Sequence, residues 1–480
     1  MKKFKARRRN LKGYMKMKKA CASLCICLQL FSLMIYSSVT GVKGLCVILG
    51  VNGNASSNEE NVVTYVGIAK YYDNRKCAVT SSLDDLTTNT TVWESCLSML
   101  TRKKIYHTVG IITNSSDWNY VQYWLNQGYT EAASHSRNHV HPPYEGIEDS
   151  KPKVSYEWQI NGSKQDIIGN LTLPALWRNR NKKYVYVWIE PFGQYNEKVR
   201  NWLGITHYLC DRCITLSSQV YDFASWDPSN ELFNRIGYTV EMGNTRWGGD
   251  SSVPSLNSKF DKAYNDSKVY HLMSHPWCVD WSIKGYADRH TDYISNRSDV
   301  WYVPLGLLYL YHWVDARSIT QVTFTDDGKQ RYFRISINQT DHEIYGVSYP
   351  ITYIFNIPQN WTSSYVYSRY RDEDPWTLMA NKSSEDYFNG INTSRFDFSK
   401  HEAYVSVAFT YLSDNIYLQI RPSPLNLGPT PAEPFMETLL GKASISGGII
   451  AAIVVTLIVF KRRFKIKKKI PITRIIRGKI

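Results

Sequence analysis

From Cys77 to Arg317, short apolar runs rich in β-branched residues alternate with segments whose apolar positions recur with a helical period. The strand-like runs are Cys77–Asp85, His107–Thr113, Tyr184–Ile189, Tyr238–Met242 and Lys268–Ser274, with a shorter one near Ile214. The helix-like segments are Thr91–Arg102, Asp117–Gln127, entered through caps at Asn114–Ser116, Tyr195–Leu203 and Ser255–Tyr264. This alternation predicts a βα-repeat domain of the α/β class, which we place at residues 45–317.

The pattern changes after Arg317 to short runs rich in Tyr, Ile, Val and Thr, separated by Asp-Gly, Asn and Pro. These runs are Thr320–Phe324, Tyr332–Ile337, Glu343–Val347, Ile351–Phe355, Tyr365–Tyr367 and Tyr404–Phe409. Their spacing predicts an all-β, sandwich-like domain over residues 318–420. We interpret its aromatic residues as core rather than as a platform for glycans. A Pro-rich linker follows at residues 421–442.

Two uncharged apolar runs lie near the ends of the chain. Ala20–Val42 follows a basic stretch and is typical of a signal peptide or signal anchor. Ala443–Phe460 is about long enough to cross a bilayer core of about 30 Å as a transmembrane helix, although a buried core helix is the alternative. With Lys461–Arg463 as a stop-transfer signal, the positive-inside rule places both tails in the cytoplasm and residues from about Lys43 to Lys442 outside. We therefore expect a protein of the cell membrane, single-pass or double-pass, whose folded central segment is extracellular.

The formal net charge of +15 lies in the two tails. Residues 1–19 and 461–480 each carry ten Lys or Arg and no acid, and between them 37 basic residues are outnumbered by 42 acidic ones. Residues 1–44 are thus a basic region plus the signal segment, and residues 461–480 are a basic cytoplasmic tail. Because the body of the chain has no excess of positive charge, nucleic acid is excluded as an expected partner.

Other features of the central segment agree with export. Asn-x-Ser/Thr sequons, which predict a glycoprotein, occur at Asn54, Asn89, Asn114, Asn161, Asn170, Asn265, Asn296, Asn338, Asn360, Asn381 and Asn392. Disulfides are expected in an oxidising compartment among Cys46, Cys77, Cys96, Cys210, Cys213 and Cys278. The Cys-x-x-Cys at 210–213 would also fit half of a zinc ribbon or a redox pair, but no second such pair exists, so we favour a disulfide role.

The stretch from Glu131 to Pro142 concentrates candidate chemistry. His135 and His139 are four residues apart, so their side chains point the same way if the backbone makes one helical turn. Two such imidazoles suit one metal ion, and a catalytic zinc site takes three protein ligands plus an open position. The alternative is an exposed polar loop.

A third ligand can come from the paired carboxylates that end the run from Cys77. A strand that ends in Asp84 and Asp85 delivers them to the carboxyl edge of its sheet, where open α/β sheets and barrels place their chemistry. The alternative is that the two Asp open the following Thr-rich turn or cap the next helix.

Together these stretches resemble the polysaccharide deacetylase (NodB-like, carbohydrate esterase) family. Its paired-Asp motif is matched by Ser82–Asp85, its His-Ser/Thr-x-x-His motif by His135–His139, and its apolar strand ending in His by Val269–His275. The resemblance spans about Cys77 to Ala316. It implies that residues 45–317 form a deformed (β/α) barrel of NodB type.

The chain departs from the family pattern in two places. The family motif Arg-x-Pro-Phe/Tyr-Gly is only partly matched by Ile189–Gly193, since Ile189 stands where the Arg is expected. That Arg tethers the catalytic base in many relatives, so another cation substitutes, the base is held differently, or the protein is inactive. For the family's Trp motif, Trp247 is the nearest candidate. His141 and His271 are interpreted as a loop residue and a strand residue.

The resemblance implies hydrolysis of N-acetyl (or O-acetyl) groups on a surface polysaccharide with the help of a divalent metal, Zn²⁺ or another ion. The implied metal ligands are Asp85, His135 and His139. The implied catalytic base is Asp84, the acid is His275, and the backbone N–H of Phe192 helps to hold the oxyanion. The alternative hypothesis is a catalytically inactive surface protein that binds glycan or has a structural role in the envelope.

Overall fold

The computed structural model describes only part of the 480-residue chain. The described residues are 62–141, 155–173, 185–193, 197–212, 237–243, 249–317, 319–326, 331–338, 350–381, 393–408 and 415–425. Among these residues, no helix combines the length and apolar character needed to cross a membrane. The predicted signal segment, the transmembrane segment, both basic tails, Glu343–Val347 and Trp247 lie outside the described residues.

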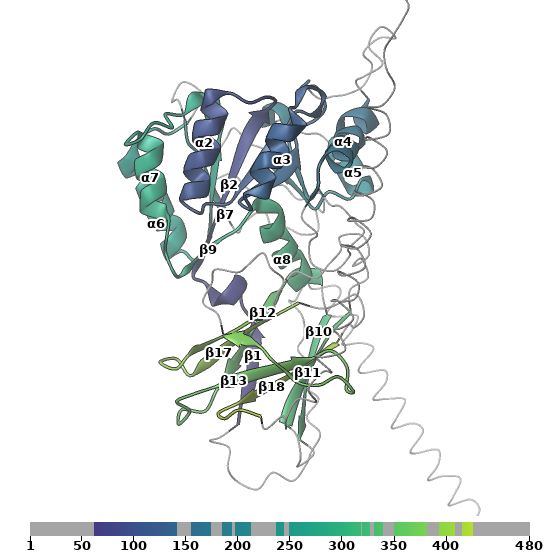
Figure 1. The fold of residues 1–480 in the computed structure, drawn as a ribbon, viewed down its shortest axis with the longest axis vertical. Helices are drawn as coiled ribbons and strands as arrows, with labels where there is room; N and C mark the ends of the chain where they lie inside the picture. The colour runs from purple at the N-terminus through teal and green to yellow at the C-terminus, as the bar shows by residue number, and fades with distance from the viewer. Residues whose placement is uncertain are drawn as a thin grey trace, which may run out of the picture. The chain divides into compact units, whose positions relative to one another are not determined.

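An eight-stranded sheet, in which every pairing is parallel, forms the first part of the fold (Figure 1). Its strands are β2 (Cys77–Leu86), β3 (His107–Ile111), β4 (Thr130–Ser134), β5 (Val187–Ile189), β6 (Cys210–Arg212), β7 (Gly237–Glu241), β8 (Val269–Ser274) and β9 (Val300–Tyr302). The order is β6-β5-β4-β3-β2-β8-β7, and β9 pairs with the start of β2. Because both faces of β2 are buried, its sequence is nearly continuously apolar or small rather than alternating.

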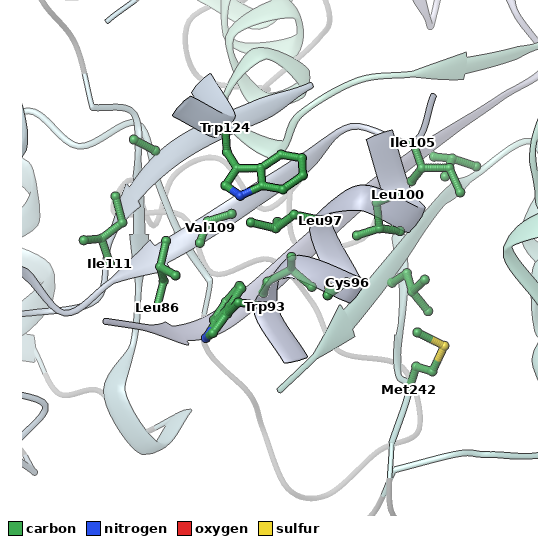
Figure 2. Close-up of a cluster of buried hydrophobic side chains, with 14 of the residues drawn as sticks. Leu86, Trp93, Cys96, Leu97, Leu100, Ile105, Val109, Ile111, Trp124 and Met242 are labelled. Atoms are coloured by element: carbon green, nitrogen blue, oxygen red, sulfur yellow. The ribbon is translucent and has the colours of Figure 1, made fainter. Parts of the chain in front are cut away.

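The helices that follow these strands are mostly those that the helical periodicity predicts. They are α2 (Thr91–Arg102), α3 (Trp118–Asn126), α4 (Gly162–Asn170), α5 (Glu197–Ile205), α6 (Val253–Asn265), α7 (Tyr286–Ile294) and α8 (Leu305–Arg317). Figure 2 shows the core in which side chains of α2 and α3 meet those of β2 and β3, including Leu86, Trp93, Leu97, Val109 and Trp124. The predicted βα-repeat organisation is therefore confirmed, although α4, α7 and α8 were not foreseen.

The predicted caps of the helix α3 were wrong, although the helix begins where it was expected. The side chain of Asp117 accepts hydrogen bonds from the backbone N–H groups of Asn119 and Tyr120 and thereby caps α3. The predicted capping stretch lies one turn earlier and forms a separate 3₁₀ turn over Thr113–Ser115. The carboxylate of Asp117, rather than the amide or hydroxyl groups before it, satisfies the first N–H groups of the helix.

Two five-stranded sheets make up the β-rich part of the chain. Their strands are β1 (Thr64–Ile68), β10 (Ile319–Asp326), β11 (Arg331–Asn338), β12 (Ile351–Asn356), β13 (Tyr365–Arg369), β14 (Thr377–Leu378), β15 (Ala380–Asn381), β16 (Thr393–Asp397), β17 (Glu402–Val407) and β18 (Asn415–Arg421). Their orders are β1-β12-β17-β16-β15 and β10-β11-β18-β13-β14. The rings of Phe333 and Phe355, one from each sheet, lie 4.8 Å apart in a shared core, as expected of core aromatics.

The strand β1 belongs to this β-rich part although it precedes the parallel sheet in sequence. It pairs antiparallel with β12 along Thr64–Ile68, a stretch that the sequence analysis grouped with residues 45–317. Strand pairing follows space rather than chain order, so the chain contributes one strand to the β-rich sheets before it enters β2.

A buried ion cluster links the segment between β1 and β2 to strand β16. Asp73, which is 5% exposed, accepts hydrogen bonds from Arg75 Nη2 at 2.7 Å and from Arg395 Nε at 2.9 Å. The backbone N–H of Asp73 donates to Thr352 Oγ1 at 2.8 Å. A carboxylate and two guanidinium groups thus compensate one another where water has little access.

We expect Asp73→Ala to lower the free energy of unfolding by about 3–5 kcal/mol, because it leaves the buried guanidinium of Arg75 without a counter-charge. Urea denaturation measures the loss. The control is Asp397→Ala, which removes the solvated ion pair with Lys400 and should cost less than about 1 kcal/mol. Equal losses in the two variants would contradict the structural role of the cluster.

Candidate active site

The carboxyl edge of the parallel sheet gathers polar side chains from five strands. They are Asp84 and Asp85 at the end of β2, His135 after β4, Arg212 at the end of β6, Glu241 at the end of β7 and His275 after β8. In a parallel sheet all strands end at one edge, so residues far apart in sequence become neighbours there. The prediction that the motif residues follow strands is therefore confirmed.

Asp85, His135 and His139 meet at this edge. Asp85 Oδ1 lies 3.4 Å from His135 Nε2 and 3.3 Å from His139 Nε2, and one ligand atom from each residue lies within 4.8 Å of the others. The predicted reason for their approach was wrong, because no helical turn joins the two histidines. His135–His139 is a loop, and left-handed backbone at Ser136 (φ 64°) and His139 (φ 53°) turns the second imidazole back toward the first.

The proton positions on His135 favour a cation between these side chains. Its Nδ1 lies 2.8 Å from the carbonyl oxygen of Ile189, which can only accept, so Nδ1 carries a hydrogen and Nε2 is the nitrogen that can offer a lone pair to a metal ion. That Nε2 and Asp85 Oδ1 are both buried and have no hydrogen-bond partner. Two buried acceptors without a hydrogen-bond partner that face each other can both bind one metal ion. A carboxylate oxygen and an imidazole nitrogen are also the kinds of ligand found in catalytic zinc sites.

Local electrostatics keep the three side chains ready to act as ligands. Burial, assisted by the neighbouring His135, lowers the pKa of His139 to about 4, so its imidazole is neutral at neutral pH. Burial alone would raise the pKa of Asp85, but its interactions with His135 and His139 lower that pKa below the usual range. Trp277 donates its indole N–H to Asp85 Oδ2 at 3.3 Å, which orients the carboxylate. A carboxylate and two neutral imidazoles are the forms that bind metal.

Asp84 is held in a different environment from its neighbour. It is 3% exposed and forms an ion pair through Oδ1 with the guanidinium of Arg212, which is equally buried. Burial raises the pKa of Asp84, but the charges of Arg212, His135 and His275 together outweigh this effect and lower the pKa. Asp84 Oδ2 lies 3.7 Å from His275 Nε2. Asp84 is therefore an ionised carboxylate with one oxygen held and the other turned toward an imidazole.

His275 stands between two carboxylates. Its Nδ1 lies 3.4 Å from Glu241 Oε1, while Nε2 faces Asp84. Burial lowers its pKa, but the hydrogen bond that the imidazole donates to Glu241 and the charges of Asp84 and Asp85 exceed this effect and raise the pKa above its ordinary value. A raised pKa favours the protonated imidazole, which is the form that can act as an acid.

Phe192 lies on the His139 side of the three residues. Its backbone is left-handed (φ 59°), its ring centroid is 4.4 Å from that of His139, and its side chain is 48% exposed. The ring of His141 stacks on Phe192 at 3.5 Å with an interplanar angle of 13°, so His141 does more than fill a loop. His271, in contrast, is a buried strand residue, as predicted, bonded to Ser82 Oγ at 2.8 Å and Thr239 Oγ1 at 2.9 Å.

The sequence analysis missed three residues of the site. Arg212 lies within the stretch that we interpreted only as a pair of cysteines, Glu241 ends a strand without any motif, and Trp277 follows His275 by two positions. Their positions could have identified them, because each of the three residues ends or closely follows a parallel strand. The cysteine interpretation finds no support among the described residues, where Cys77, Cys96, Cys210 and Cys278 are free. Cys46 and Cys213 lie outside them.

Comparison with known proteins gave no matching family model and no matching curated protein. Among solved structures, the chain is similar to a family 4 carbohydrate esterase from Streptomyces lividans in complex with acetate, at 14% identity over 45% of this chain and 85% of that chain, with a TM-score of 0.27. It is also similar to a family 4 acetyl xylan esterase from Clostridium thermocellum in complex with a cobalt ion, at 12% identity over 48% of this chain and 90% of that chain, with a TM-score of 0.28. The polysaccharide deacetylase Bc1974 from Bacillus cereus is similar at 11% identity over 47% of this chain and 91% of that chain, with a TM-score of 0.29.

Identities and TM-scores this low leave the functional assignment to the side chains of this chain itself. The three solved structures named here are two carbohydrate esterases and a polysaccharide deacetylase.

Proposed function

We propose that this protein is a divalent-metal-dependent deacetylase that hydrolyses N-acetyl or O-acetyl groups of a polysaccharide. The observation that carries the proposal is the pair of buried, unpartnered acceptors on Asp85 and His135, with His139 completing the set. Two further titratable groups, Asp84 and His275, lie beside them, and the pKa of Asp84 is lowered while that of His275 is raised. A base and an acid flanking a metal site are what acyl hydrolysis needs.

Each residue then has a distinct part in the reaction. Asp85, His135 and His139 would hold the ion, with Zn²⁺ the best fit to one carboxylate and two imidazoles. Such an ion supplies Lewis-acid activation of the acyl group and of water.

The remaining groups move protons and hold charge. Asp84 Oδ2 takes the proton of the attacking water, and His275 Nε2 gives a proton to the departing amine or alcohol. The backbone N–H of Phe192 donates to the developing oxyanion. Asp84 Oδ2 and His275 Nε2 lie 3.7 Å apart, so the two proton-transfer groups belong to one site.

Exposed aromatic side chains on two sides of the metal ligands support a sugar as substrate. Phe192, stacked on His141, contacts His139, and Trp277, 59% exposed, contacts Asp85. Exposed aromatic faces beside a polar centre offer apolar contact area together with a hydrogen-bonding edge, which suits the alternating character of a sugar ring.

We further propose that the enzyme is anchored in the cell membrane with this site outside the cell. Support comes from the sequence alone, from the apolar runs at Ala20–Val42 and Ala443–Phe460 with their basic flanks. The inactive, glycan-binding alternative drew its support from Ile189 in the place of the motif Arg. The ion pair between Arg212 and Asp84 weakens that support.

Asp85→Asn and His139→Ala should each abolish tight binding of Zn²⁺, because each removes one of three ligands, and should lower acetate release from N-acetylglucosamine oligomers to background. Isothermal titration with Zn²⁺ and an acetate assay measure the two effects. His141→Ala is the matched control and should still bind one ion, since its ring stacks on Phe192 and is no ligand. Unchanged Zn²⁺ affinity in both ligand variants would rule out the proposed site.

Asp84→Asn should leave Zn²⁺ binding intact but reduce kcat by about 10²–10⁴-fold, because the amide cannot accept a proton from water. Steady-state kinetics on the same oligomers, with the metal content of each preparation measured, separate this effect from loss of the ion. An Asp84→Asn variant with wild-type kcat would assign the base to another residue.

Trp277→Ala should raise KM for oligomers several-fold, corresponding to about 0.5–1.5 kcal/mol of lost aromatic contact. Trp277→Phe, which keeps an aromatic face but loses the N–H that reaches Asp85, should retain most of the affinity. KM measured on oligomers of increasing length tests both variants. If the Ala variant keeps its KM for long oligomers, Trp277 does not contact the glycan.

A further inference from the structure

The motif position that lacks its arginine faces an arginine on the neighbouring strand. Strands β5 and β6 pair in parallel with Ile189 opposite Arg212. Side chains at paired positions project to the same face of a sheet, so Ile189 and Arg212 share the face that bears the site. The next residue, Asp211, pairs with Trp188 and points to the opposite face. Arg212 thus places a cation directly beside the position that Ile189 leaves apolar.

Ile189 serves the site through its backbone only. Its carbonyl oxygen accepts from His135 Nδ1, while its side chain is fully buried and packs toward Gly110. The charge that Asp84 needs therefore comes from β6. Arg212 is 2% exposed, reaches Asp84 Oδ1 through Nη2, and places Nη1 3.1 Å from the sulfur of Met273 on β8. The guanidinium is fixed from two neighbouring elements and cannot turn away from the carboxylate.

We propose that Arg212 is the positioning residue for Asp84 and that it takes over, from β6, the task of the missing arginine on β5. It occupies Oδ1 and so leaves Oδ2, which faces His275, as the oxygen that accepts the proton. A planar guanidinium fixes the plane of a carboxylate, which a point charge does not. This inference rests on the proposed deacetylase function, and it explains how the site is complete despite Ile189.

The experiment exchanges the two residues. Arg212→Ile should lower kcat by about 10–100-fold with little change in KM or Zn²⁺ affinity, because the base loses its orientation while the three ligands remain. The double variant Ile189→Arg with Arg212→Ile conserves the total side-chain volume and should regain a large part of that loss. Guanidinium ion added to Arg212→Ala should also raise kcat. Arg75→Ala, which breaks an equally buried ion pair with Asp73, is the control and should show no such rescue.

Two results would overturn the proposal: an Arg212→Ile enzyme with wild-type kcat, or a loss that neither the exchange nor guanidinium repairs. If the Ile and Ala variants do not fold, Arg212→Lys keeps the buried charge, and the proposal then requires a lowered kcat at unchanged Zn²⁺ affinity. If the wild-type chain releases no acetate, the deacetylase function fails separately. Crystal structures of wild type and Arg212→Lys then decide the positioning role, which requires the Asp84 carboxylate to turn in the variant and is refuted if it stays in place.

Discussion

A buried carboxylate at the edge of a parallel sheet cannot remain ionised unless a cation is buried with it, and the site depends on this constraint. Asp84 satisfies it through Arg212, and because both side chains are almost inaccessible to water, neither can be lost without leaving the other uncompensated. The adjacent Asp85 is freed from this pairing and turns to His135 and His139 instead. Two neighbouring residues of the same type thereby lie in different electrostatic environments, because they have different partners.

The geometry of the site also depends on irregular backbone where the strands end. Asp85, Ser136, His139 and Phe192 all have positive φ angles. For residues with a Cβ such conformations are unfavourable, and they persist where the surrounding structure determines them, commonly at functional sites. Here the parallel sheet supplies the rigid frame, and the left-handed residues redirect side chains that a regular strand would have sent to either face.

Much of the site could be predicted because its motif residues follow apolar strands that the sequence displays clearly. The spacing of His135 and His139 predicted that the two imidazoles lie close together, which they do, but for an incorrect reason, since a loop with left-handed residues joins them. Arg212 and Glu241 could not be found in this way, because each is a single polar residue at the end of a short strand and belongs to no motif. Only the strand order shows that they lie beside the other residues of the site. The helix α8 was missed because its first residues, buried among both sets of strands, show no polar side to reveal a helical period.

The relation between Ile189 and Arg212 shows why a missing motif residue need not mean a missing function. Paired positions on neighbouring parallel strands lie about 4.8 Å apart and face the same side, a separation that a long arginine side chain spans easily. A guanidinium can therefore move from one strand to the next and still reach the same carboxylate, provided that the vacated position is filled by an apolar residue of suitable size. Ile189 meets that condition, since it is fully buried and still offers its carbonyl to His135. The site needs a cation beside Asp84, and an arginine on either β5 or β6 can supply it.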